Sequence, residues 1–92
     1  MSERRGYRVR GRVQGVGFRW WTRRWGLDLG LRGNVCNLPG GGVEVQVAGS
    51  AEQLDALEEA LWGGPPMSRV DSVEPVAPAG VIPESGFLIE GR

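Results

Sequence analysis

The stretch YRVRGRVQGVGFRWWTRRWGLDLG, residues 7–30, decides the fold because its hydrophobic period changes once along its length. Over residues 7–13 the side chains alternate, with Tyr7, Val9, Gly11 and Val13 on one side and Arg8, Arg10 and Arg12 on the other. Strict alternation predicts a half-buried strand. After a glycine-rich loop, apolar residues recur at helical spacing, at Phe18, Trp21, Trp25 and Leu29. This spacing predicts a helix whose tryptophan stripe packs in the core, with Gly30 as its stop signal.

The chain downstream continues with two strands and a second helix. LRGNVCNL (31–38) and VEVQVAG (43–49) predict strands, joined by the tight turn PGGG (39–42). Ser50 and Gln53 have the spacing of a capping box. They open a helix that carries Leu54, Leu57 and Leu61 on one face and ends at the GGPP of residues 63–66.

The last third of the chain predicts two more strands. Residues 69–76 form an edge strand, because Pro75 cannot donate to a ladder. A loop follows, and FLIE (87–90) closes the chain. This order predicts an α+β fold, the ferredoxin-like split-βαβ sandwich, with a mostly antiparallel sheet of four strands plus a short fifth and two helices on one face.

The opposite face of that sheet is expected to be open to water. It would carry Arg8, Arg10, Arg12, Glu44 and Gln46. The first and third strands are neighbours in this topology, so Glu44 can pair with one of the arginines. We expect residues 1–6 to form a flexible N-terminal tail and residues 7–92 to form a single domain.

Composition narrows the classes of function. With one cysteine, Cys36, and no histidine, an internal disulfide is excluded, and neither a metal site nor a cofactor is expected. The opening MSERRGYRVRGR lacks an apolar core, and no apolar run could cross a bilayer, which predicts a cytoplasmic protein without a membrane partner. Residues 1–32 hold nine arginines and two carboxylates, a net charge of +7, so this part of the chain attracts anions.

The loop QGVG (14–17) lies where the first strand meets the first helix. Glycines let successive backbone N–H groups turn inward and form a concavity that binds anions, and the helix start adds partial positive charge. Arg19, in the first helical turn, is unfavourable there unless an anion lies between the loop and the guanidinium. A tight turn followed by a solvated arginine remains the alternative.

GRVQGVGFR (11–19), followed by GLRGNVCNLPGGGVEVQVAG (30–49), resembles the acylphosphatase family. The match continues through LWGGPPMSRVDSVE (61–74) to GFLI (86–89). The resemblance implies an enzyme that hydrolyses acyl phosphates to a carboxylate and inorganic phosphate, without a metal or cofactor.

The resemblance also implies roles for particular residues. The loop would bind the phosphate group through Gln14, Gly15, Val16, Gly17 and Phe18. Arg19 would be the main phosphate ligand, and Asn37 would position the attacking water. An asparagine can both donate and accept hydrogen bonds, so it can hold a water without acting as a base. A strand-end turn residue before Pro39 is the alternative for Asn37.

The chain departs from the usual family pattern at several positions. Asn34 and Cys36 stand where a tryptophan and an arginine are usual; by alternation they point away from Asn37, so altered packing is expected rather than loss of chemistry. Gly40 replaces the usual aspartate of the turn. Gly26 replaces a common alanine, which costs about 1 kcal/mol of helix propensity. Cys36 also raises the hypothesis that activity is sensitive to thiol oxidation.

Two other classes of function compete with the hydrolase. One is an anion-binding module with weak catalysis. The other is an RNA-binding sheet, which needs stacking aromatics on its central strands, and VEVQV has none. We therefore expect a monomer that acts on a small-molecule acyl phosphate and binds no nucleic acid.

Overall fold

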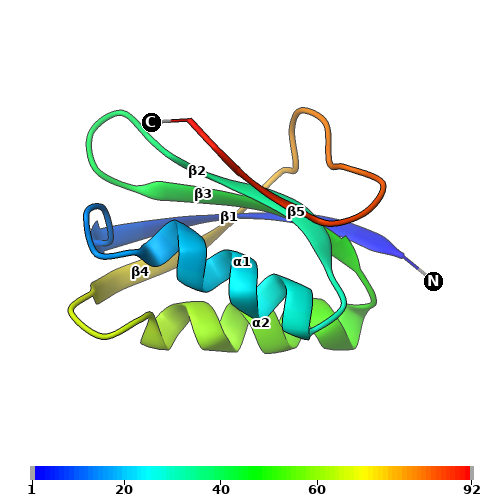
Figure 1. Ribbon diagram of the computed structural model, residues 1–92, viewed down its shortest axis with the longest axis horizontal. Coiled ribbons are helices and arrows are strands. Elements are labelled where there is room, and N and C mark those ends of the chain that lie inside the picture. The colour runs from blue at the N-terminus through cyan, green and yellow to red at the C-terminus, as the bar shows by residue number, and fades with distance from the viewer. Residues whose placement is uncertain (1, 92) are drawn as a thin grey trace.

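The computed structural model describes residues 2–91, which build one five-stranded sheet and two helices. The elements are β1 (Glu3–Arg12), α1 (Phe18–Asp28), β2 (Arg32–Asn37), β3 (Val43–Gly49), α2 (Ala51–Gly63), β4 (Arg69–Val76) and β5 (Phe87–Glu90). The strand order is β4-β1-β3-β2-β5, with β5 parallel to β2 and the other pairs antiparallel. Both helices cover the same face (Figure 1). The predicted ferredoxin-like arrangement with a short fifth strand is confirmed.

β1 begins at Glu3, so the strand takes in most of the segment that was expected to be a tail. Glu3 lies opposite Gly49, and the pairing with β3 continues as far as Val9. Arg5 donates a hydrogen bond to Asp55 of α2 at 2.7 Å. The expected start at Tyr7 was too late, because backbone pairing and this contact with α2 extend the strand beyond the point where its alternation is visible. Residue 1 lies outside the described residues.

The core follows the predicted alternation of β1 and β3. The buried side chains that form its centre are Tyr7, Val9, Val13, Val43, Val45, Val47, Leu54, Leu57 and Leu61. Burying a valine or leucine stabilises a fold by roughly 1.5–3 kcal/mol. The capping box of α2 is also confirmed, since the Gln53 N–H donates to Ser50 Oγ at 3.1 Å and the Ser50 N–H donates to Gln53 Oε1 at 2.8 Å.

The buried line of α1 differs from the predicted stripe. Phe18, Thr22 and Gly26 are buried, whereas Trp21 and Leu29 pack against the core while partly exposed. The prediction was wrong for Trp25, which is 40% exposed. The rings of Trp21 and Trp25 lie beside this buried line, which consists of Phe18 and the small residues Thr22 and Gly26. The helix ends at Asp28 with Leu29 as its C-cap, and Gly30 follows in the left-handed region at the expected stop position, with a φ of 79°. The Leu31 N–H then donates to the Gly26 carbonyl at 2.8 Å.

Gly26 of α1 lies directly against Phe87 of β5. A Cβ at this position would overlap the ring of Phe87, which is itself buried. Gly26 is therefore required by the close approach of a neighbouring ring. Glycine at this position lowers helix propensity, as expected from the sequence. The sequence does not reveal that the packing against Phe87 requires it.

Gly26→Ala is expected to destabilise the protein, although alanine is the better helix former. Forcing an extra methyl group into a packed core costs about 1–3 kcal/mol, whereas the gain in helix propensity is about 1 kcal/mol. Urea denaturation of the variant and the natural chain measures the difference. Gly63→Ala is the matched control, because Gly63 is also helical and a Cβ there would meet nothing within 4 Å. A Gly26→Ala variant as stable as the natural chain would show that Phe87 can move aside.

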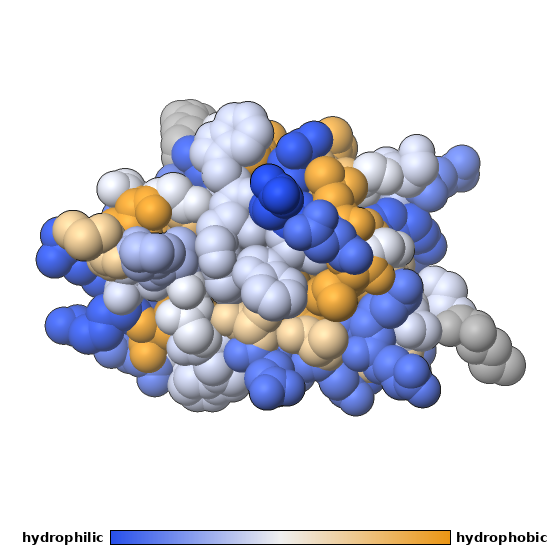
Figure 2. Space-filling model, turned by 60° about the horizontal axis from the view of Figure 1, so that its bottom comes forward, coloured by the Kyte–Doolittle hydropathy of each residue, from blue (hydrophilic) through white to orange (hydrophobic). Residues whose placement is uncertain are grey.

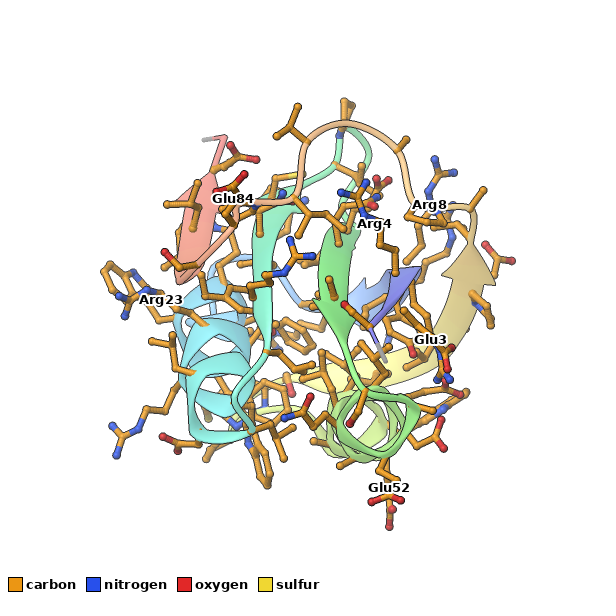
Figure 3. All side chains as sticks on the ribbon, turned by 90° about the vertical axis from the view of Figure 1, so that its right-hand side faces the viewer. Glu3, Arg4, Arg8, Arg23, Glu52 and Glu84 are labelled. Carbon is orange, nitrogen blue, oxygen red and sulfur yellow. The ribbon has the colours of Figure 1, made fainter. Side chains whose placement is uncertain are left out.

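The second face of the sheet is partly covered by the loop of residues 77–86, which arches over it opposite the helices (Figure 3). Asn34 Nδ2 donates to the Val81 carbonyl at 3.0 Å, and the Ala79 N–H donates to Gln46 Oε1 at 3.0 Å. The expectation of an open face was therefore wrong for Gln46, whose side-chain amide bonds to the loop and is buried. Asn34, which was expected to point away from Asn37 with altered packing, is buried under the same loop. The expected contact of Glu44 with an arginine is confirmed, with Arg8 at 3.1 Å.

The outer side of the helical layer is mostly polar. Figure 2 looks onto this side, where blue and pale side chains surround smaller orange areas. Within residues 2–91, neither helix is long and apolar enough to cross a membrane. Phe18 of α1 and Leu54, Leu57 and Leu61 of α2 belong to the core that these helices form with the sheet.

Candidate active site

A hollow of about 180 Å³ lies where β1 ends, α1 begins and β2 ends. The residues around it are Val13, Gly15, Gly17, Phe18, Arg19, Trp20 and Asn37. The structure therefore brings the two principal candidates, Arg19 and Asn37, to one site from separate elements. Gly15, Gly17 and Phe18 of the predicted phosphate loop line the same hollow, whereas Gln14 and Val16 have other contacts.

The loop has the backbone conformation that its glycines predict. Gly15 has a φ of 75° and Gly17 a φ of 78°, both in the left-handed region. A Cβ at either position would meet nothing within 4 Å, so conformation rather than space requires glycine. Gly17 is the N-cap of α1 and has no side chain with which to cap the first turn. The N–H groups of that turn are thus suited to an anion.

Gln14 fastens the loop to the turn that follows β2. Its Nε2 donates to the Leu38 carbonyl at 2.9 Å and to the Gly42 carbonyl at 2.8 Å. The side-chain N–H donors of Gln14 are used in these two hydrogen bonds. A contact between Gln14 and an anion would therefore have to come from its backbone N–H. Val16 packs partly buried against the core. Gln14 and Val16 therefore support the loop, whereas Gly15, Gly17 and Phe18 line the hollow. Sequence reasoning did not separate these two roles.

Arg19 is held in place by the last strand of the sheet. Its Nη1 donates to the backbone carbonyl of Glu90 at 3.1 Å. A guanidinium has several further N–H donors in a planar fork, which matches the oxygens of a phosphate group. β5 therefore orients the cation at the hollow. Nothing in the sequence signals this contact, because a backbone carbonyl is common to every residue.

Asn37 ends β2, opposite Val43 of β3. It also borders a second hollow of about 430 Å³, which it shares with Gln14, Leu38, Pro39 and Gly91. The turn beyond it is closed, because the Leu38 N–H donates to the Gly42 carbonyl at 2.7 Å. The hairpin that carries Asn37 is thus formed despite glycine at position 40.

Cys36 precedes Asn37 and is partly buried. Burial raises the pKa of the Cys36 thiol, and the nearby Glu44 and Glu90 carboxylates raise it further, whereas Arg19 acts in the opposite direction. A raised pKa means less thiolate at neutral pH, and the thiolate is the form that oxidants attack. The surroundings of Cys36 therefore give no support to the hypothesis of oxidation-sensitive activity.

Among residues 2–91, no three histidine, cysteine or carboxylate side chains lie close enough together to hold a metal ion. Independence from metals and cofactors stays a prediction, to be tested with a chelator. The site instead offers backbone N–H groups, one guanidinium and one side-chain amide. These groups bind and orient anions and water.

The fold and this site together define a ferredoxin-like α+β protein with a small hollow, lined by N–H donors and a guanidinium, at the junction of a strand and a helix. The acylphosphatase family model matches residues 5–89. The chain belongs to the acylphosphatase family. The resemblance found in the sequence is confirmed over nearly the whole chain.

Individual relatives agree with this membership. An acylphosphatase from Nitratidesulfovibrio vulgaris is 59% identical over 70 residues, which cover 76% of this chain and 70% of that protein. One from Mycobacterium sp. strain JLS is 54% identical over 65 residues, covering 71% and 69%.

Solved structures show the same fold. The acylphosphatase from Bacillus subtilis superposes with a TM-score of 0.88 at 31% identity, covering 99% of this chain and 100% of that one. The structure of an acylphosphatase from Coxiella burnetii gives a TM-score of 0.84 at 34% identity, covering 97% and 93%.

Proposed function

We propose that this chain hydrolyses acyl phosphates to a carboxylate and inorganic phosphate at the hollow between β1, α1 and β2. The reaction is that of the family to which the chain belongs. The observation that carries the assignment to this site is the meeting of Arg19, Asn37 and the glycine loop around one hollow.

The phosphate group is held by positive charge and N–H donors. The backbone N–H groups of residues 14–18 and the first turn of α1 bind its oxygens, helped by the partial positive charge at the helix start. Arg19 adds a full charge and a fork of donors. Stabilising the charge of the transferring phosphoryl group is the main task of such a site.

Asn37 orients the water that attacks phosphorus. The bond from the water oxygen to phosphorus forms as the bond from phosphorus to the carboxylate oxygen breaks, with the two oxygens roughly in line, and both protons of the water remain on oxygens of the inorganic phosphate that forms. The leaving group is a carboxylate and a weak base, so it needs no general acid. In agreement with this, the described residues around the hollow include no carboxylate or imidazole.

The substrate is a small acyl phosphate, and the protein acts without a nucleic-acid, membrane or cofactor partner. It acts as a monomer in the cytoplasm. The loop of residues 77–86 supports the exclusion of RNA, because it occupies part of the sheet surface on which bases would stack. Gln46 of the central strand β3 is bonded to that loop.

Phosphate release from benzoyl phosphate in the presence of EDTA tests this function. We expect turnover well above spontaneous hydrolysis, unchanged by the chelator and inhibited competitively by inorganic phosphate. Activity that is lost with EDTA and restored by a divalent cation would overturn the metal-independent mechanism. Absence of turnover together with binding of inorganic phosphate would favour the anion-binding module.

A further inference from the structure

Trp20 is a large exposed ring beside the proposed phosphate site. Its exposure is 68%, whereas Phe18 and Trp21 of the same helix pack against the core. Trp20 follows Arg19 directly and borders the same hollow as Arg19 and Asn37. An exposed tryptophan at the edge of a binding site offers a large flat apolar surface to a ligand.

The guanidinium of Arg23 lies over the ring of Trp20. Its guanidinium carbon lies 5.9 Å from the ring centroid, within the range of a cation–π contact. Its Nε donates to the Phe87 carbonyl at 3.0 Å, so the guanidinium is anchored to β5. Figure 3 shows Arg23 on the outer flank of α1. A ring oriented in this way loses little conformational freedom when a ligand packs against it.

The size of the hollow implies that the acyl group extends beyond it. Pockets for small molecules commonly measure about 300–1,000 Å³. The hollow here is about 180 Å³. It suits the phosphate group and a water molecule, while a larger acyl group must lie on the neighbouring surface.

Two surfaces adjoin the hollow, one beside Leu38 and Pro39 and the other on α1. The geometry of the reaction indicates which of them the acyl group contacts. In an in-line displacement the leaving group lies opposite the attacking water. The water is assigned to Asn37, and the second hollow, next to Leu38 and Pro39, adjoins that same residue. The acyl group therefore leaves toward the other wall, which is formed by α1 and carries Trp20.

We propose that Trp20 is a specificity-determining residue whose exposed ring packs against the acyl group and favours aromatic acyl phosphates. This inference rests on the proposed function. An offset or edge-to-face contact between two aromatic rings corresponds to about two- to tenfold in affinity or rate. An acetyl group has no ring and would gain little from the same contact.

Steady-state kinetics of Trp20→Ala with benzoyl phosphate and acetyl phosphate test the inference. We expect kcat/KM for benzoyl phosphate to fall about three- to tenfold, mainly through KM, and kcat/KM for acetyl phosphate to change less than about twofold. Trp20→Phe retains a ring and is expected to keep most of the preference. Equal losses for both substrates, or no loss for benzoyl phosphate, would overturn the proposal.

Trp62→Ala is the matched control, because Trp62 is a 50% exposed tryptophan on α2 beside Asp55, Glu58 and Glu59, away from the hollow. We expect it to leave the ratio of the two substrates unchanged. A change equal to that of Trp20→Ala would show that loss of any surface tryptophan has this effect, and would overturn the proposal.

Binding separates this inference from the proposed function. Phenylphosphonate and methylphosphonate cannot be hydrolysed at their P–C bond, and calorimetry measures their binding without turnover. A preference of the natural chain for phenylphosphonate that Trp20→Ala removes supports the role of Trp20, even if the chain hydrolyses neither acyl phosphate and the hydrolase proposal fails. Equal binding of both phosphonates by the natural chain would overturn the role of Trp20.

Discussion

Arg19→Ala is expected to abolish the turnover of acyl phosphates without unfolding the protein. Removing a single donor to a transition state typically costs about 10²–10³ in rate. Arg19 supplies both donors and a full positive charge, so we expect a loss of at least about 10³ in kcat/KM. The rate is measured as phosphate release from benzoyl phosphate. Calorimetry measures the binding of inorganic phosphate, and we expect the variant to lose this binding as well.

Arg24→Ala is the matched control for this experiment. Arg24 lies on the same helix, is highly exposed, and pairs with Asp28 at 3.3 Å rather than bordering the hollow. Its removal should leave kcat/KM nearly unchanged. Arg19→Lys adds a second comparison, because lysine keeps the charge but loses the planar fork. A folded Arg19→Ala variant with most of its activity would contradict the assignment of Arg19 as the phosphate ligand.

Asn37→Ala is expected to lower kcat by about 10²–10³ while leaving the affinity for inorganic phosphate almost unchanged. The reason is that Asn37 acts on the water and not on the phosphate group. Kinetics with benzoyl phosphate give kcat, and competitive inhibition by phosphate gives the affinity. This division between rate and binding distinguishes Asn37 from Arg19, for which both should fall.

Asn34→Ala provides the matched control on the same strand. Asn34 is buried on the other face of β2 and bonds to the Val81 carbonyl. Its loss should lower the free energy of unfolding but leave kcat per folded molecule near that of the natural chain. If Asn34→Ala lowered kcat as much as Asn37→Ala, the effect would be attributable to distortion of β2, and the water-positioning role would be rejected.

The elements of the fold could be predicted because their signals are local. Alternation in β1 and β3, the Ser50–Gln53 box and the Gly30 stop each depend on residues close together in the chain. The failures involve contacts between distant residues. The early start of β1 depends on Asp55, and the covering of Gln46 depends on the loop at Ala79. No periodicity encodes such contacts.

The candidate site was predictable to a similar degree. The resemblance placed Arg19 and Asn37, and the conformational freedom of glycine placed Gly15 and Gly17. Two features of the site could not be foreseen: the anchoring of Gln14 to the turn after β2, and the bond from Arg19 to a backbone carbonyl. Each depends on backbone atoms or on packing, which have no residue-type signature.

The bond between Arg19 and the Glu90 carbonyl joins the first helix to the last strand. Contacts between residues so far apart in the chain carry the largest entropic cost of loop closure, and topologies rich in them fold slowly. Helix formation and the pairing of β2 with β3 involve much shorter separations. During refolding, the guanidinium would therefore reach its final orientation only when β5 docks beside β2. Regain of catalysis would then report this late, long-range event rather than the appearance of secondary structure.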